Sequence, residues 1–125
     1  MEIHQSAEDY LETILILKER SGQVRSIDIA TEMNYTKPSI SVAMKKLREN
    51  GYIQVDKDGF ITLTKSGYEI ASNIYTRHKV LTDFFISLGV NAKTADEDAC
   101  KIEHDLSEET FEKIREHAEK ASHRH

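Results

Sequence analysis

The fold is decided by residues 26–51, whose sequence is SIDIATEMNYTKPSISVAMKKLRENG. Residues 26–33 predict a short helix, and a tight turn through Asn34 and Tyr35 follows it. A second helix opens at Thr36-Lys37-Pro38, where proline in the first turn costs no hydrogen bond, and runs to the Asn50-Gly51 stop. Two short helices joined by such a turn predict a helix-turn-helix. The inward face expected for the first of them is formed by Ile27, Ala30 and Met33.

The second helix has two contrasting sides at about 100° per residue. One is apolar, with Ile40, Ala43, Met44 and Leu47, and the other is small, hydroxylated and basic. Such a face fits a DNA major groove, because lysine reaches phosphates or guanine edges, serine donates or accepts, and valine touches a thymine methyl. For this helix alone an ordinary solvated face is an equal alternative, but its neighbours favour DNA binding. The predicted contacts are Thr36, Lys37, Pro38, Ser39, Ser41, Val42, Lys45, Lys46 and, in the following hairpin, Lys57.

The segments on either side complete a winged-helix pattern. After Gly51 the apolar period changes to two over residues 53–63, which predicts a β-hairpin with Gly59 at its turn, the wing. A first helix is expected from a Ser6 cap to Ser21-Gly22, and a long helix from a Thr64 cap to Gly89. Two further helices are expected, over about 92–106 with Ala95, Ala99 and Ile102 inward, and after a Ser107 cap with Phe111, Ile114 and Ala118 inward.

The predicted fold class is mainly α with a small β wing. A winged helix-turn-helix DNA-binding domain is expected in residues 1–68, an all-helical metal-binding and dimerisation domain in 69–121, and a disordered tail in 122–125. The apolar stripe of the long helix exceeds what the small N-terminal core can cover. We assign the surplus to a homodimer interface.

Composition limits the classes of protein to consider. A chain of 125 residues is too short for a large multidomain enzyme. No apolar run reaches the roughly 18 residues needed to cross a bilayer, and no signal peptide is evident, so we expect a cytoplasmic protein without membrane partners. The net charge of −5 opposes nucleic-acid binding, but residues 37–48 hold four basic side chains and no acid, while acids crowd 2–12 and 96–116.

Side chains able to bind a metal recur on three of the predicted helices. A thiol, a carboxylate and an imidazole follow at spacings of three and four near residue 100, which places them on one helix face. Two carboxylates flank a buried stripe of the first helix, and one histidine lies on the apolar stripe of the long helix. Taken singly, each has an ordinary structural explanation, whereas shared metal coordination explains all of them. The candidates are Asp9, Glu12, His78, Cys100, Glu103 and His104.

The chain resembles the family of the diphtheria toxin repressor and the manganese transport regulator, which are iron- and manganese-responsive repressors. The matching stretches extend over nearly the whole chain and comprise Ala7 to Glu12, Thr36 to Ser41, Leu63 to Gly67, Arg77 to Lys79, and Ala99 to Ser107. The resemblance implies a winged helix-turn-helix followed by a helical dimerisation domain, in a short form that ends before the SH3-like domain of longer members.

The resemblance also implies roles for individual residues. Asp9 and Glu12 correspond to the first-helix carboxylates of the manganese branch, and His78 to the family's long-helix histidine. Cys100 corresponds to the iron branch's cysteine, at a position where the manganese branch has glutamate. Asp96 stands where the iron branch has an accessory histidine, and the family's shared Glu-His pair corresponds to Glu103 and His104.

These observations predict a non-enzymatic repressor that binds palindromic double-stranded operator DNA as a homodimer when loaded with Fe(II) or Mn(II). One or two ions per subunit are expected, and the genes controlled would be those of metal uptake or homeostasis. A metal-independent winged-helix regulator is one alternative. The other is a small zinc hydrolase using His78, Cys100, Glu103 and His104, although no helical His-Glu-x-x-His pattern occurs.

Overall fold

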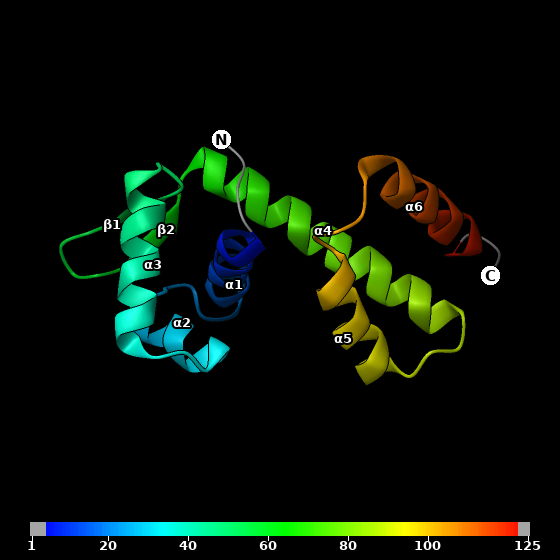
Figure 1. Ribbon diagram of the computed structural model, residues 1–125, viewed down its shortest axis with the longest axis horizontal. Helices are drawn as coiled ribbons and strands as arrows, with labels where there is room; N and C mark the ends of the chain where they lie inside the picture. The colour runs from blue at the N-terminus through cyan, green and yellow to red at the C-terminus, as the bar shows by residue number, and fades with distance from the viewer. Residues whose placement is uncertain (1–4, 123–125) are drawn as a thin grey trace. The chain divides into compact units, whose positions relative to one another are not determined.

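The computed structural model describes residues 5–122 (Figure 1). Within this range the chain is mainly helical with one two-stranded antiparallel hairpin, which confirms the predicted fold class. The elements are α1 (Gln5–Ser21), α2 (Ser26–Met33), α3 (Lys37–Glu49), β1 (Ile53–Val55), β2 (Ile61–Leu63), α4 (Lys65–Ser87), α5 (Ala92–Ile102) and α6 (Glu108–Ser122).

The chain forms two compact units, one up to Asn73 and one from Ile74 onward. The division falls inside α4, so this helix gives its first part to one unit and its second part to the other. The predicted domain boundary after residue 68 stays a prediction. Of the predicted disordered tail, Ser122 ends α6, and residues 123–125 lie outside the described residues.

The helix-turn-helix of the first unit forms as predicted, because local signals mark each of its ends. Asn34 ends α2 in the left-handed conformation, with φ 58°, which asparagine tolerates better than most residues. Thr36 caps α3 by accepting a hydrogen bond from the Ser39 amide at 3.3 Å. The apolar side of α3 is buried through Ile40, Met44 and Leu47.

Two details of the predicted helices are wrong. Ile27 is 45% exposed, whereas Ala30 is buried as predicted, together with Ile29. In so short a helix two apolar faces compete, and tertiary packing decides between them. The first helix was expected to start from a Ser6 cap, but α1 already includes Gln5.

The wing has one buried and one exposed face. Ile53 and Ile61 are buried, while Gln54 and Thr62, which pair across the strands, point outward. The Asp56 carboxylate closes the turn by accepting hydrogen bonds from two backbone amides of the loop, at 2.9 and 3.0 Å. The exposed face therefore carries polar side chains on a fixed hairpin.

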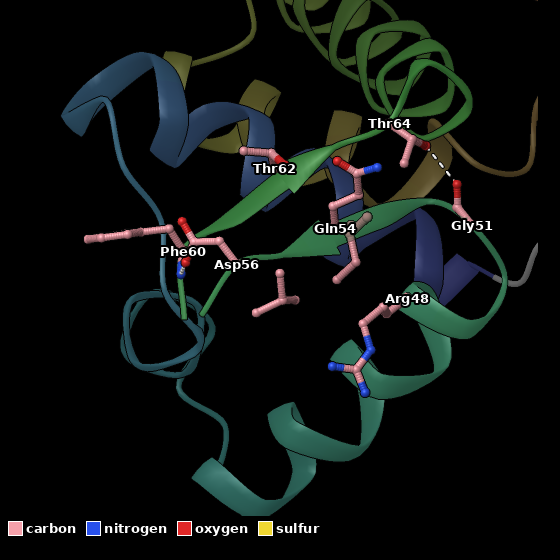
Figure 2. Close-up of a pocket in the computed structure, with 9 residues that line it drawn as sticks. Arg48, Gly51, Gln54, Asp56, Phe60, Thr62 and Thr64 are labelled. Atoms are coloured by element: carbon pink, nitrogen blue, oxygen red, sulfur yellow. Dashed lines mark hydrogen bonds between the residues drawn. The ribbon is translucent and has the colours of Figure 1, made fainter. Parts of the chain in front are cut away.

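The start of α4 is tied to the turn after α3. The Thr64 hydroxyl donates to the Gly51 carbonyl at 2.7 Å and accepts from the Gly67 amide at 3.2 Å (Figure 2). Gly67 lies so close to the Tyr52 carbonyl that a Cβ at this position would overlap it. The predicted Thr64 cap is thus confirmed, and glycine is required at 67 by a close backbone approach.

The second unit consists of the later part of α4 with α5 and α6. Its core includes Ile74, Leu81, Ala95, Ala99 and Phe111, each no more than 4% exposed. α5 ends at Ile102, earlier than the predicted end near residue 106. Among residues 5–122, no helix combines the length and apolarity that crossing a membrane requires.

Candidate nucleic-acid interface and metal centre

The outward side of α3 presents the predicted DNA-contacting residues to solvent. α3 has no acid in its first turn and carries Lys46 and Arg48 in its last. Val42 is 55% exposed, so its methyl groups are open to contact from solvent or a partner. All nine predicted contact residues are exposed: Thr36, Lys37, Pro38, Ser39, Ser41, Val42, Lys45, Lys46 and Lys57.

A groove runs between the last turn of α3 and the exposed face of the wing (Figure 2). Arg48 lines it from the helix, and Gln54 and Thr62 line it from the strands. Sequence analysis assigned no role to these three residues. Two signals could have identified them: the basic end of α3, and the period of two in the strands, which turns polar residues away from Ile53 and Ile61.

The second unit holds an imidazole between two carboxylates. His78 of α4 has Nδ1 2.8 Å from Glu103 Oε2 and Nε2 2.7 Å from Asp96 Oδ1. The side chain of Glu103 is fully buried and that of His78 is 19% exposed, whereas that of Asp96 is 64% exposed. Three predicted metal ligands are therefore brought together within this unit.

These contacts change the proton affinity of His78. The hydrogen bond that His78 donates to Glu103, and then the one that it donates to Asp96, raise the pKa of His78 to about 9, although burial acts in the opposite direction. The imidazole consequently carries a proton on each nitrogen, and a positive charge, at neutral pH. A divalent cation bound to the same ring must displace one of these protons, because one nitrogen lone pair cannot serve both.

Glu103 is the C-cap of α5 with right-handed helical backbone, whereas His104 lies in the turn that follows, beyond the end of the helix. The Glu103 amide closes the last helical turn by donating to the Ala99 carbonyl at 3.0 Å. The His104 side chain is 2% exposed, and its Nε2 lies 3.4 Å from Glu103 Oε1. This separation permits charge attraction but is too long for a strong hydrogen bond.

A buried carboxylate oxygen is left with no hydrogen bond in this turn. Glu103 Oε1 accepts none from residues 5–122, the part of the chain that the structure describes. Burying such an oxygen costs free energy unless a donor or a cation compensates it. Carboxylate oxygen and imidazole nitrogen are ligands that Fe(II) and Mn(II) accept, so the donor set fits a divalent metal.

The remaining candidates differ in burial. Cys100 is exposed while Glu103 is fully buried, so the thiol and the carboxylate differ in exposure. Their grouping with His104 as one set of ligands stays a prediction. In the first unit, α1 carries Asp9 half-buried and Glu12 8% exposed beside the fully buried Leu11, as expected for side chains flanking a buried stripe.

Two protein families match the chain, one over its first half and the other over its second half. Residues 2–60 match the family described as the iron dependent repressor, N-terminal DNA binding domain. Residues 64–124 match the family described as the iron dependent repressor, metal binding and dimerisation domain.

Similar proteins support the same assignment. An HTH-type transcriptional regulator of Methanocaldococcus jannaschii is 39% identical over 113 residues, which are 89% of this chain and 90% of that protein. The HTH-type transcriptional regulator MntR of Geobacillus thermodenitrificans is 34% identical over 87% of this chain and 77% of its own length.

Among solved structures, the manganese regulator SloR is 32% identical and superposes with a TM-score of 0.76. The match covers 88% of this chain and 52% of SloR, so the chain spans about half the length of that structure. The predicted resemblance is confirmed, and the chain belongs to the iron-dependent repressor family of metal-dependent transcriptional regulators.

Proposed function

We propose that this chain represses transcription by binding a palindromic operator as a homodimer when it is loaded with Fe(II) or Mn(II). The observation that carries the proposal is the buried Glu103 carboxylate, which has one oxygen on His78 and the other, without a hydrogen bond among residues 5–122, facing His104. The genes controlled would be those of metal uptake or homeostasis.

The metal ligands we propose are Asp9 and Glu12 of α1 in the first unit, and His78, Glu103 and His104 in the second. One or two ions would bind per subunit. Asp96, which bonds the outer nitrogen of His78, and Cys100, at the end of α5, are the candidates for a second ion or for selectivity. When bound, the metal supplies positive charge and a link between ligands that are distant in sequence.

Iron and manganese are each supported by one of the comparisons. The matching family descriptions name iron, while the similar structure SloR is a manganese regulator. Carboxylates suit Mn(II), whereas a thiolate favours Fe(II) over Mn(II). Cys100 as a ligand would therefore favour iron.

We propose that α3 reads the major groove. Lys45 and Lys46 would contact phosphates or guanine edges, and Val42 would contact a thymine methyl. The hydroxyls of Thr36 and Ser39 already bond to one another at 2.9 Å, which orders the end of α3 that would meet the DNA backbone. Lys57 of the wing would add a phosphate contact.

The dimer would be formed by the helical unit. Its matching family description names dimerisation, and α4 ends in large apolar side chains with solvent-exposed surface, Ile86 at 43% and, just beyond the helix, Leu88 at 65%. Two reading heads related by a two-fold axis would match a palindromic operator, whose half-sites lie about one helical turn apart or a multiple of it.

Calorimetric titration of the apo chain with Mn(II), and anaerobically with Fe(II), tests the proposed metal function. We expect binding by the unmodified chain and a loss of about 10- to 100-fold or more in affinity for Glu103→Gln, which removes the charge but keeps the shape. The matched control is Glu97→Gln, an exposed acid of α5. Equal metal affinities of the two variants would contradict the proposal. Hydrolytic turnover that Glu103→Gln abolishes and Lys45→Ala leaves unchanged would favour the alternative, a small zinc hydrolase.

A further inference from the structure

A single arginine holds the turn that carries the two buried ligand candidates. Arg77 of α4 is 8% exposed, and its Nη1 donates to the Glu103 carbonyl at 3.1 Å and to the Leu106 carbonyl at 3.0 Å. Both carbonyls lie beyond the end of α5, where no further helical turn supplies donors. The backbone of residues 103–106 is therefore fixed by a side chain from another helix.

The same guanidinium also rests on α6. Its carbon lies 5.1 Å from the ring centroid of Phe111, which is 4% exposed. Arg77 thus contacts the turn on one side and α6 on the other, all within the second unit. A planar, permanently charged group with several donors suits this position better than a flexible ammonium.

Arg77 and His78 act on the same residue from neighbouring positions. His78 holds the Glu103 carboxylate through Nδ1 at 2.8 Å, while Arg77 holds the Glu103 carbonyl. The side chain and the main chain of Glu103 are thereby both fixed by α4. A metal ligand held at two points loses less conformational freedom when the ion binds.

We propose that Arg77 is a positioning residue of the metal centre: it sets the 103–106 turn so that Glu103 and His104 are presented to the ion in binding geometry. The proposal rests on the proposed metal function and deepens it. Arg77 itself donates only, carries a positive charge and is not a ligand.

The test compares three substitutions in the full-length chain, Arg77→Met, Arg77→Gln and Arg77→Lys. The matched control is Arg115→Met on α6, which removes an arginine that is 45% exposed and pairs with surface glutamates of its own helix. Mn(II) affinity is measured by calorimetry, the visible absorption of bound Co(II) reports ligand geometry, and circular dichroism on heating reports folding of the apo chain.

We expect Arg77→Met to weaken Mn(II) binding by about 10- to 100-fold and to alter the Co(II) bands. Arg77→Gln and Arg77→Lys, which keep a donor, should lie between Arg77→Met and the unmodified chain, and Arg115→Met should match the unmodified chain. A merely structural role would lower the melting temperature without moving the Co(II) bands of the folded protein.

Unchanged affinity and unchanged Co(II) bands in folded Arg77→Met would overturn the proposal. Should that variant not fold, unchanged affinity and bands in both Arg77→Lys and Arg77→Gln would overturn it equally, because neither restores both carbonyl contacts in the arginine geometry. If the unmodified chain itself binds neither Mn(II) nor Co(II), the proposed metal function fails first, and this result is distinct from equal binding by unmodified and substituted chains.

Discussion

His78 is the residue at which a proton would compete with the proposed metal ion. Its two ring nitrogens lie within 2.8 Å of carboxylate oxygens of Glu103 and Asp96, and these contacts raise its pKa from 6.5 to about 9. In the apo chain the charged imidazole stabilises the fold fully below about pH 6.5, and this contribution is lost as the pH rises through about 9. Metal binding would require the neutral ring. Metal affinity would therefore rise with pH, whereas the contribution of His78 to the stability of the apo fold falls.

We therefore expect Mn(II) affinity to rise with pH up to about 9. At pH 7 each ion bound at His78 should release about one proton from this residue. Calorimetry in two buffers with different enthalpies of ionisation measures the number released. With His78→Gln the release from this site should disappear, and an unmodified chain that releases no proton at pH 7 would contradict the assignment of His78 as a ligand.

The proposed preference for iron rests on Cys100. Cys100→Glu replaces the softer thiolate by a hard carboxylate, so the ratio of Mn(II) to Fe(II) affinity should rise, by about tenfold. Anaerobic competition between the two ions measures this ratio. Cys100→Ser serves as a control for loss of the thiol alone. An unchanged preference in Cys100→Glu would mean that Cys100, which is exposed at the end of α5, is not a ligand.

At the scale of elements, α3 is expected to gain affinity mainly from charge. Lys45→Ala should weaken DNA binding similarly for different sequences and reduce the slope of log affinity against log salt by about one, because one phosphate contact is lost. Fluorescence anisotropy with a labelled duplex at several salt concentrations measures the slope. Lys101→Ala in α5, exposed on the other unit, is the matched control. A slope unchanged by Lys45→Ala would remove this residue from the interface.

The junction between α3 and α4 depends on a missing side chain. Gly67→Ala should destabilise the first unit by about 1–3 kcal/mol, because the added methyl would overlap the Tyr52 carbonyl and the backbone must move. Denaturant unfolding measures the change, with the neighbouring exposed Ser66→Ala as control. Equal stability of the two variants would show that the close approach is easily relieved.

Most helices and strands were predictable from the sequence, because the residues that mark their ends act locally. Thr36 and Asn34 mark helix ends through their own backbone and side-chain hydrogen bonds, and the change of apolar period after Gly51 marks the wing. The end of α5 was missed because it is set by a distant residue. No glycine or proline lies within 101–106, and Arg77 captures the carbonyls there from α4.

The candidate site was predictable as a set of residues but not as an arrangement. Ligand-capable residue types at regular spacing identified Glu103, His104 and His78 from the sequence. Their geometry was not accessible, because spacing along the chain does not tell that Cys100 is exposed while Glu103 is fully buried. Asp96 was a candidate through the family resemblance, but its bond to the outer nitrogen of His78 depends on the packing of α5 against α4.

For the whole molecule, the net charge of −5 opposes binding to DNA unless something compensates it. Two divalent ions per chain would add roughly four positive charges before proton release. The basic face of α3 and the acidic ligand set would thus be linked by one equilibrium: metal binding would both offset the repulsion and fix the ligands. The apo chain should bind DNA weakly.

The most direct test uses a labelled DNA duplex selected from a random library in the presence of Mn(II). The fluorescence anisotropy of this duplex is followed as Mn(II) is added anaerobically to the apo chain. The account predicts weak binding in chelator, a gain of at least about 100-fold at saturating metal, equivalent to about 3 kcal/mol, and no such gain for Glu103→Gln. Tight binding that persists after exhaustive chelation, or an equal gain in Glu103→Gln, would contradict it.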